Sequence, residues 1–590
     1  MTILDLTSVP ISDDDPKSRE EIKSITSYRK QNPVKMYYLD EINDVYYLSL
    51  EDFASIFEGN YASGLSFTVS EDGPISTWSI NRFKTPEYIL TLDALNKTMT
   101  VEGASLSAYI ISTTATGYSG MGQNMTASYE FVEEHPNTNR VYSLGDYDFD
   151  VFEADGHYRY PFALLLAEVS KSTDRSFLTL SATSELLEYG SQEQLDRASF
   201  LLEDGTKITA NDYINKAYAS QYGTGVPGED PVEPEALRVF NRNLFYFIMD
   251  NYYGISMERG ISSMRDYFES FADSANFLSE NGTKRGNAYF RLVQMLNDLH
   301  TAYSYSPYFG EKGDSEGIYS QTMYRIRMDL YTFLTDMRQS AIDEYNLLHE
   351  TELSETGVRY SSDGKYAYFS FDKFKTYTVY NTGFIPRNVQ LEDTYNLFVE
   401  NLNEAKRRGV ERVIIDDSCN SGGYIGIMAE LLALLSKDNY GVLYVQGGDN
   451  GSIQKMTVRV DSNKDGVYDE SDCFGNDFEF YIVTSNFSFS CGNAFPVLAA
   501  SYGYAKIVGQ KSGGGECCVY TFRFPSGQVL TYSSPYHLGF YGDDGTFRGA
   551  EVGTFVQYGI GDGFHDLYDV DAVASRIETI DEGGFGPFPI

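Results

Sequence analysis

The pattern of apolar and polar positions changes twice along the chain, and each change marks a predicted domain boundary. From 1 to 220, short alternating runs end at turn-forming pairs, which predicts β strands and therefore β-rich (α+β) accessory modules. From 235 to 356, apolar residues recur every three or four positions, which predicts a helical domain. From 357 to 590, apolar runs alternate with amphipathic stretches, which predicts an α/β core. The linker QYGTGVPGEDPVEPEA separates the first two segments.

Two stretches of the N-terminal segment resemble each other. VKMYYLDEINDVYYLSLEDFASIF and YDFDVFEADGHYRYPFALLLAEVS each predict a strand, a turn, a second strand and a helix. The predicted turns are Asn43–Asp44 and Asp155–Gly156, because Asp, Asn and Gly between alternating runs are typical of hairpins. The segment resembles small β modules that flank secreted bacterial enzymes, and we assign no chemistry to it.

The C-terminal segment predicts a largely parallel sheet covered on both faces. KYAYFSFDKF, VERVIIDDS, DFEFYIVTS and AKIVGQ are predicted strands, and helical patterns separate them. CVYTFRFPSGQVLTYSSPYHLG predicts a hairpin that turns at Ser526–Gly527. The stretch from 302 to 357 is short and largely helical in pattern, so we expect no PDZ domain in it.

Charge and composition exclude some classes of binding partner and favour a location. The 590 residues carry a net charge of -40, which argues against binding to nucleic acid, whose phosphates need basic residues. No apolar run approaches the roughly 20 residues of a membrane helix, and the N-terminus lacks the pattern of a signal peptide. The acidic, Tyr-rich composition and the β modules favour a bacterial extracellular or cell-surface location. The chain has five cysteines, too few for a disulfide scaffold, and all of them lie in its last third.

Three short stretches carry candidate chemistry. NFSFSCGNAF, residues 486–495, follows a predicted strand and precedes a predicted helix, and hydrolases place a small nucleophile at such a turn. VIIDDSCNSGGYIG contains Gly422 and Gly423, whose backbone N–H groups can face a developing negative charge, although a tight turn alone would need the same glycines. MLNDLHTAY places His300 at or just past a helix end.

Together these stretches resemble the C-terminal processing peptidases, or tail-specific proteases, and their tricorn-like relatives. IIDDSCNSGG is similar to that family's IDLRxNxGG, FSFSCGN to its xSASASE, MLNDLHTAY to its LLxDxHT, and GQKSGGGE to its GxKxxGxG. The resemblance covers about 235 to 590. It implies a serine protease core of the crotonase or ClpP-like kind, with Ser490 as the nucleophile and a peptide or protein as the substrate.

One departure from the family bears on the mechanism. The processing peptidases use a Ser-Lys dyad, but the position of that lysine is Gly515 here, and Lys511 matches another, non-catalytic lysine. A serine without a base is a poor nucleophile. The tricorn-like branch uses a histidine of the helical domain and a glutamate instead. That resemblance implies His300 as the base and Glu551, in RGAEVGTFVQ, as the residue that orients it.

The roles then follow from chemical need. Ser490 Oγ attacks the scissile carbonyl, His300 transfers the proton, and Glu551 stabilises the imidazolium. Backbone N–H groups of the Gly422–Gly423 turn, chiefly that of Gly423, and of Cys491 hold the oxyanion. No cofactor is needed for this chemistry.

Three alternatives compete with this interpretation. An α/β-hydrolase would use Ser490, then Asp543 or Asp544, then His565, but SFSCG lacks the G-x-S-x-G spacing. Cys491 could be the nucleophile, although its side chain should point away from a site that Ser490 enters. A peptide-binding protein built on a catalytically decayed protease would also explain the missing lysine.

DSNKDGVYDESD predicts a structural calcium site. Its spacing matches positions 1, 3, 5, 7, 9 and 12 of an EF-hand-type loop, with Gly466 at the sharp bend. A solvated acidic turn is the simpler alternative, because Asp, Asn and Gly favour turns anyway. The flanking stretches predict strands instead of the helices of an EF-hand. The predicted ligands are Asp461, Asn463, Asp465, Val467, Asp469 and Asp472.

Overall fold

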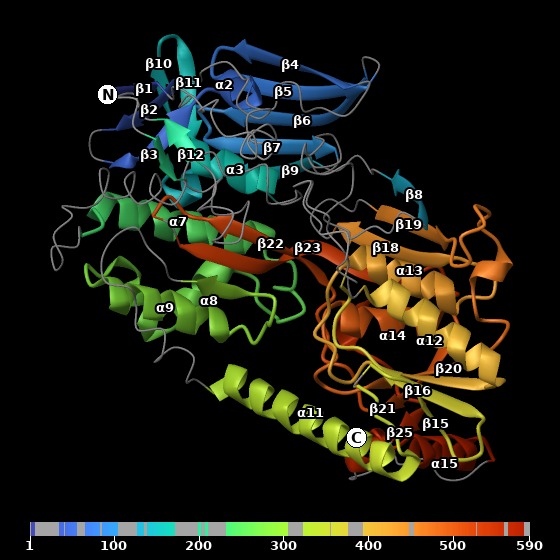
Figure 1. Ribbon diagram of the computed structural model, residues 1–590. Coiled ribbons are helices and arrows are strands. Elements are labelled where there is room, and N and C mark those ends of the chain that lie inside the picture. Colours follow the sequence, from blue (N-terminus) through green and yellow to red (C-terminus); the bar gives the residue numbers. More distant parts are fainter. Residues whose placement is uncertain are drawn as a thin grey trace.

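The fold consists of an N-terminal β part, a middle helical part and a C-terminal α/β core (Figure 1). The computed structural model describes residues 2–5, 35–39, 42–55, 65–82, 85–103, 127–134, 139–170, 199–201, 207–209, 232–304, 322–354, 356–375, 393–447, 453–526, 528–559 and 564–582. In Figure 1 the N-terminal sheets lie above the short helices of the middle part, and the core lies beside both.

Two antiparallel sheets form most of the N-terminal part. The first has the strand order β1-β2-β3-β11-β10 and the second β4-β5-β6-β7-β9. The first sheet comprises β1 (Thr2–Asp5), β2 (Lys35–Leu39), β3 (Ile42–Leu48), β10 (Phe152–Ala154) and β11 (His157–Pro161). The second comprises β4 (Leu65–Asp72), β5 (Ile75–Arg82), β6 (Thr85–Asp93), β7 (Thr98–Gly103) and β9 (Asn139–Ser143). A separate short pair is β12 (Ser199–Leu201) and β13 (Lys207–Thr209).

The two similar N-terminal stretches share one sheet. Their second strands pair antiparallel, with Leu48 opposite Tyr160, and each strand leads into a helix, α2 (Leu50–Ser55) or α3 (Phe162–Ser170). The predicted turn at Asp155–Gly156 is confirmed, because both residues have positive φ and lie between the paired strands β10 and β11.

The other predicted turn, Asn43–Asp44, is wrong. Leu39 pairs with Ile42, so both residues lie inside β3, where the register with β2 shifts. A shift of this kind leaves residues of one strand unpaired, and polar residues tolerate that position. The polar pair Asn43–Asp44 that predicted a turn therefore marks an irregularity within strand β3.

The middle part packs against the N-terminal part through aromatic rings. Its elements are α7 (Glu235–Tyr252), α8 (Met264–Glu269), the 3₁₀ helix η5 (Ala272–Leu278) and α9 (Gly282–Gln294). Phe247 of α7 contacts Tyr142 and Tyr147, with ring centroids 5.9 and 5.3 Å apart. The apolar core that begins in the N-terminal sheets continues without a break through α7 to the β22–β23 hairpin described below. The middle helices therefore cannot shift without disturbing both neighbours.

The predicted parallel sheet lies in the C-terminal core. Its strand order is β15-β16-β17-β20-β21-β25, and every pair except β15–β16 is parallel. The strands are β15 (Arg359–Tyr360), β16 (Tyr366–Ser370), β17 (Arg412–Asp416), β20 (Glu479–Thr484), β21 (Ala505–Gly509) and β25 (Tyr558–Gly559). Helices α12 (Thr394–Arg408), α13 (Ile425–Leu435) and α14 (Cys491–Ser501) share one apolar cluster with this sheet, and α11 (Thr322–His349) and α15 (Val570–Asp581) share another.

A second sheet, antiparallel in every described pairing, draws strands from all three parts of the chain. Its order is β14-β23-β18-β19-β8, and β22 and β24 also pair with β23. The strands are β8 (Ala127–Glu134), β14 (Ala302–Ser304), β18 (Gly441–Gly447), β19 (Ile453–Val460), β22 (Cys517–Arg523), β23 (Val529–Tyr541) and β24 (Phe547–Gly549). The hairpin predicted around Ser526 is β22–β23. Because β14 directly follows the segment of His300, its pairing with β23 ties that segment to the core.

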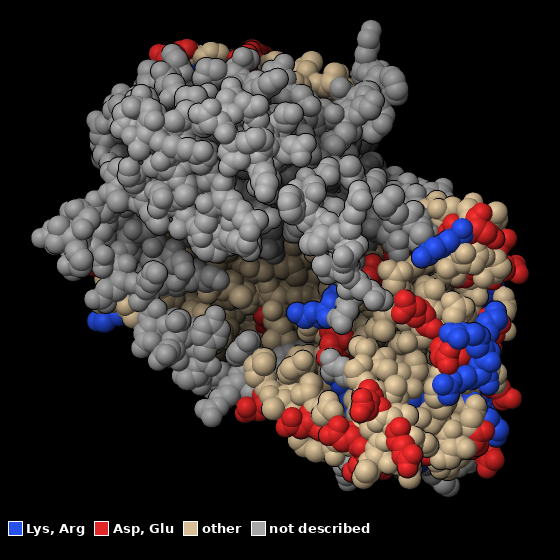
Figure 2. Space-filling model, viewed as in Figure 1, with Lys and Arg blue, Asp and Glu red and all other residues tan. Residues whose placement is uncertain are grey.

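Acidic and basic side chains are interspersed over the core on the face that Figure 2 shows. The basic last turn of α12, with Lys406, Arg407 and Arg408, is partly offset by Glu404 and Asp477 through ion pairs of 2.7 to 2.8 Å. That face therefore offers no broad basic surface for phosphates. None of the described helices combines the length and the hydropathy that a membrane span needs.

Candidate active site

The candidate site lies where parallel strands of the core sheet end. Strands β17, β20 and β21 run in the same direction, so the turns after Asp416, Thr484 and Gly509 gather at one edge. Crevices outside the carboxyl ends of parallel strands are where α/β proteins place their sites. The turn after β17 and the turn after β20 interlock, since Ser485 Oγ donates to the Ser418 carbonyl at 2.5 Å and Phe489 N–H to the Asn420 carbonyl at 3.0 Å.

Ser490 occupies a strained turn between β20 and α14. Its φ of 58° and ψ of −125° lie outside the regions that a non-glycine residue favours. The side chain is partly exposed, and its Oγ makes no hydrogen bond to any residue that the structure describes. Ser488, by contrast, is fully buried and donates to the Asp417 carbonyl at 2.8 Å. Of the two serines, only Ser490 is placed to react.

The thiol of Cys491 points away from the position of a nucleophile. It is buried and donates a hydrogen bond to the Gly423 carbonyl at 3.2 Å. Burial raises the pKa of the Cys491 thiol to about 12. Since the thiolate is the reactive form of cysteine, this thiol is a poor nucleophile near neutral pH.

The glycine turn after β17 lies directly against Ser490. Gly422 has a φ of 105°, and a Cβ there would lie 2.7 Å from Ser490 Cβ, so only glycine fits. Its N–H already donates to Asn420 Oδ1 at 2.8 Å. The N–H groups of Gly423 and Cys491 make no such bond within the described part of the chain. Gly422 therefore permits the close approach, and the other two residues supply the uncommitted donors.

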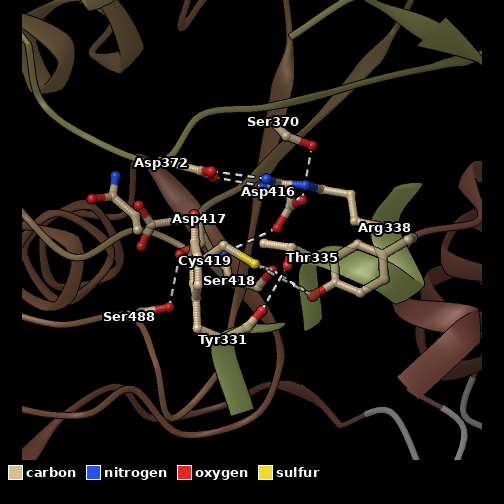
Figure 3. A network of polar contacts seen from close by, with 12 residues as sticks. Tyr331, Thr335, Arg338, Ser370, Asp372, Asp416, Asp417, Ser418, Cys419 and Ser488 are labelled. Atoms are coloured by element: carbon tan, nitrogen blue, oxygen red, sulfur yellow. Dashed lines mark hydrogen bonds and ion pairs between the residues drawn. The ribbon is translucent and has the colours of Figure 1, made fainter. Parts of the chain in front are cut away.

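A buried ion pair fixes the start of this turn (Figure 3). Arg338, from the distant helix α11, donates to Asp372 at 2.7 and 2.8 Å and lies 3.8 Å from a carboxylate oxygen of Asp416. Asp416 also accepts from Ser370 Oγ at 2.8 Å and from Ser418 N–H at 2.9 Å. The carboxylate that ends β17 is thus held by neighbours on both sides.

The next residue, Asp417, is a buried carboxyl without such support. It is fully buried, and neither of its oxygens makes a hydrogen bond to a described residue. Burial, and then the nearby charge of Asp416, raise the pKa of Asp417 well above its usual range. The family motif has leucine at this position, so the sequence places a carboxylic acid where an apolar residue is expected.

His300 contacts Phe489, the residue that directly precedes Ser490. The imidazole ring is buried and packs on the ring of Phe489, with centroids 4.7 Å apart. Asp298 shapes the segment, because it accepts from His300 N–H at 3.0 Å and from Thr301 Oγ1 at 2.6 Å. No hydrogen bond joins His300 to Ser490 or to Glu551 among the described residues.

Glu551 belongs to a separate set of contacts near the same turn. Its carboxylate accepts from the N–H groups of Gly515 and Glu516 at 2.8 and 3.1 Å, and Arg259 lies 3.8 Å away. Gly514, which precedes Gly515, accepts from Ser490 N–H at 3.0 Å. The loop 510–516 therefore connects the candidate nucleophile with the candidate acid.

Charges around Glu551 favour its protonated form. Burial raises the pKa of Glu551, and although the two backbone N–H groups oppose this, the charges of Glu516 and Asp298 raise it further. The influence of Asp298 places the His300 segment close to Glu551. A cation formed on that segment would in turn favour the ionised form of Glu551 and would be stabilised by Glu551 and Asp298.

The position of the family's catalytic lysine has no room for a long side chain. A Cβ on Gly515 would lie 2.6 Å from the Phe489 ring and 3.0 Å from Ser490 N. Lys511 is exposed instead of facing the site. Asn493, which replaces a frequent glutamate of the family, bonds to the Ala550 carbonyl and to Ser512 Oγ and so joins α14 to the loops that flank Glu551.

Sequence reasoning missed a second buried pair beside Glu551. His537 Nδ1 lies 2.5 Å from Glu516 Oε1, and Glu516 Oε2 accepts from Glu551 N–H at 2.6 Å. Burial lowers the pKa of His537, but the hydrogen bond and the charge of Glu516 outweigh it and the net pKa is raised. Glu516 stands in the GQKSGGGE stretch that carried the family resemblance, so its position was a signal that went unused.

The predicted calcium loop folds around inward-facing oxygens. Asp461 accepts from the N–H groups of Asp465 and Gly466 at 3.1 and 3.0 Å, and Asp472 from those of Asn463 and Asp469 at 3.2 and 3.1 Å. Asp461 and Asp472 are buried. Burial raises the pKa of Asp472, and the charge of Asp461 adds to the effect. The loop leaves β19 and leads through η6 (Glu470–Asp472) toward β20, so its flanks are strands as predicted.

The α/β-hydrolase alternative finds no support in this geometry. Asp543 and Asp544 are exposed in the turn between β23 and β24, and Asp544 pairs with Arg548 at 2.9 Å. His565 lies in η8 (Phe564–Leu567), and its side chain lies outside the described part of the structure. Both candidate acids of that alternative, Asp543 and Asp544, are therefore exposed at the surface.

Comparison with known proteins identifies the class of the core. Residues 365–542, which lie within the core, match the model of peptidase family S41, in agreement with the family resemblance of the sequence. No curated protein matches the chain. The fold class agrees with the prediction of an α/β peptidase core preceded by helical and β-rich parts.

Three solved structures are similar to the chain. A protein from Parabacteroides merdae matches with a TM-score of 0.40 and 13% identity, over 59% of this chain and 98% of that one. Mature CPAF matches with a TM-score of 0.35 and 10% identity, over 60% and 99%. The tricorn protease matches with a TM-score of 0.35 and 11% identity, over 94% of this chain and 65% of that one. At these TM-scores the likenesses carry no argument about the site.

Removal of Arg338 should destabilise the core. In Arg338→Met the carboxylate of Asp416 stays buried but loses its cation, which typically costs about 3–5 kcal/mol. Arg407→Ala is the control, because Arg407 is exposed and its ion pair with Glu404 should contribute less than about 1 kcal/mol. Urea unfolding of both variants measures the difference. Equal losses would show that Arg338 holds no buried charge.

Asp417 should make stability fall as pH rises. A carboxyl whose pKa is raised by folding contributes fully below the unfolded pKa of about 3.9, and its contribution is lost at about 1.4 kcal/mol per pH unit above that. Asp417→Asn cannot lose this proton. The stability of the variant relative to the natural chain should therefore increase between pH 4.5 and 7.5 in urea unfolding. A difference that stays constant over this range would mean that Asp417 is ionised in the folded protein.

Proposed function

We propose that this chain is a serine endopeptidase that cleaves peptide bonds through an acyl-enzyme. The observation that carries the proposal is the position of Ser490. Its Oγ is uncommitted on a strained strand-to-helix turn, and the unpaired N–H groups of Gly423 and Cys491 lie on the two segments that meet there. A nucleophile next to two fixed donors is the arrangement that acyl transfer needs. The match of residues 365–542 to a peptidase family supports a peptide as the substrate.

The first half of the reaction forms the acyl-enzyme. Ser490 Oγ attacks the carbonyl carbon of the scissile bond while His300 accepts the hydroxyl proton. The carbonyl oxygen becomes an oxyanion, which the N–H groups of Gly423 and Cys491 stabilise. When the C–N bond breaks, the imidazolium returns its proton to the leaving amine. Water then repeats the sequence on the ester and releases Ser490.

His300 is the best candidate for the base because the chain offers no lysine there. Gly515 and the Phe489 ring fill the position of the family's lysine, and His300 packs on that ring. The absence of a bond between His300 and Ser490 requires a small reorientation when substrate binds. Catalytic hydrogen bonds often tighten only in the substrate complex. Glu551 and Asp298 would stabilise the imidazolium once it forms.

A peptide-binding protein built on a decayed peptidase is the competing function. One observation favours it: the carboxylate of Glu551 is bound to the N–H groups of Gly515 and Glu516 and makes no bond to His300. A triad that never closes would leave a groove that binds peptides without cleaving them. The two functions differ in whether Ser490 reacts.

A fluorophosphonate probe distinguishes the two functions. We expect the probe to label the natural chain and Cys491→Ala but not Ser490→Ala, because only the Ser490 hydroxyl is activated. Hydrolysis of an unfolded protein substrate should fall by about 10⁴-fold or more in Ser490→Ala and His300→Asn. No labelling of the natural chain would support the binding protein instead.

We also propose that the loop 461–472 holds a structural calcium ion. The buried carboxylates of Asp461 and Asp472 lie in the same loop as Asp465 and Asn463, and a cation would offset the repulsion between Asp461 and Asp472. The loop ends shortly before β20, the strand that leads to Ser490. Calcium would therefore stabilise the approach to the site and take no part in the chemistry.

Removal of calcium should lower the melting temperature. Addition of a chelator to the calcium-loaded chain should lower the midpoint, because the repulsion between carboxylates returns, and calcium should restore it. Asp465→Ala should remove this response. Asp477→Ala is a matched control, since Asp477 is an acidic residue outside the loop that pairs with Lys406. A midpoint that does not respond to chelator would leave only a solvated acidic turn.

A further inference from the structure

A buried trio of metal-type ligands lies next to the candidate acid. Glu516, Cys517 and His537 are each no more than 8% exposed, and their ligand atoms all lie within 4.8 Å of one another. Cys517 and His537 are cross-strand partners on β22 and β23, and Glu516 directly precedes β22. No other group of three such side chains is this close within the part of the chain that the structure describes.

The donor set is one that zinc-class ions prefer. Imidazole nitrogen, thiolate and carboxylate are the ligands of zinc sites, whereas calcium and magnesium take oxygen ligands. Tetrahedral zinc would set the sulfur and nitrogen ligands about 3.6 Å apart. Cys517 Sγ lies 3.7 Å from His537 Nδ1. His537 Nδ1 and Glu516 Oε1, which now share a hydrogen bond of 2.5 Å, would have to separate by roughly 0.8 Å.

The charges around the trio favour a cation. Glu258, Glu516 and Glu551 act on His537, and Glu516, Glu551 and Asp298 act on Cys517. Among the described residues, Arg259 forms its ion pair with Glu551, at 3.8 Å, and none with Glu516. A divalent ion would offset several of these negative charges at once. On binding, the Cys517 thiol and any proton on His537 Nδ1 would be released to solvent, leaving thiolate and neutral imidazole as ligands.

We propose that Glu516, Cys517 and His537 form a binding site for a divalent ion of the zinc class, and that the bound ion lowers the activity of the site. The ion is not needed for peptide cleavage. Its effect would pass through Glu516, whose second carboxylate oxygen accepts the N–H of Glu551. An ion that sets Glu516 Oε1 farther from His537 Nδ1 shifts the Glu516 carboxylate, which weakens that bond and displaces Glu551. Only this second step depends on the proposed peptidase function.

Cobalt absorption tests the site without any assumption about activity. Co²⁺ added to the full Ser490→Ala chain should bind in a 1:1 ratio and produce a thiolate-to-cobalt charge-transfer band, which one equivalent of Zn²⁺ removes. Cys517→Ser should lose the band and bind Co²⁺ at least about tenfold more weakly. Cys518→Ser, the neighbouring cysteine, should keep it. The calcium loop contains no sulfur and cannot give this band. No band in the starting chain, or a band unchanged in Cys517→Ser, would overturn the proposal.

Activity provides the second readout. Zn²⁺ should inhibit the natural chain, and Cys517→Ser should keep the basal rate but resist inhibition, since Cys517 takes no part in catalysis. Thermal unfolding of Cys517→Ser and of Cys517→Ala identifies a variant that fails to fold. If the chain shows the cobalt band but no peptidase activity, the metal site is supported and the proposed peptidase function is wrong. A band together with equal inhibition of both chains would reject control through Glu516.

Discussion

The geometry of the site depends on the carboxylate of Asp416, which lies fully buried at the end of the central strand β17. An isolated charge in that position would be costly, and three neighbours offset the cost: Arg338, which Asp372 holds in place, Ser370 and the N–H of Ser418 (Figure 3). These contacts set the direction in which the chain leaves β17. The turn that follows brings Gly422 against Ser490, so a buried charge far from the reacting atoms determines the position of the oxyanion donors.

The cation of this arrangement comes from outside the core sheet. Arg338 belongs to α11, a helix that precedes the core in sequence and packs beneath the sheet together with α15. The segment of His300 also comes from outside, and β14 holds it by pairing with β23. The sheet alone therefore supplies a nucleophile and two donors, and the helical part supplies the base and the cation that supports the turn. A site assembled in this way needs both parts docked.

The pattern of apolar and polar residues predicted the features that depend on neighbouring residues in the sequence. The strands and helices of the core, the turn at Asp155–Gly156, and the position of Ser490 between a strand and a helix all follow from periodicity and from Gly and Asp residues. Pairings between distant segments were not predictable. Nothing in the pattern of α11 marks Arg338 as the partner of Asp416, and nothing in SSPYHLG indicates that His537 meets Glu516. The misplaced turn at Asn43–Asp44 has the same origin, because the pairing partner, not the local residues, set the register.

The strand β8 has a consequence for how the protein is made. Its residue Glu134 pairs with Ile453, which follows 319 positions later in the chain. At a synthesis rate of about 5–20 residues per second, β8 would wait roughly 16 to 64 s for its partner strand. During that time its backbone donors and acceptors stay open to any other strand that reaches them. Nascent chains of this protein are therefore most exposed to wrong pairing before the core is complete, and slower translation would lengthen that period.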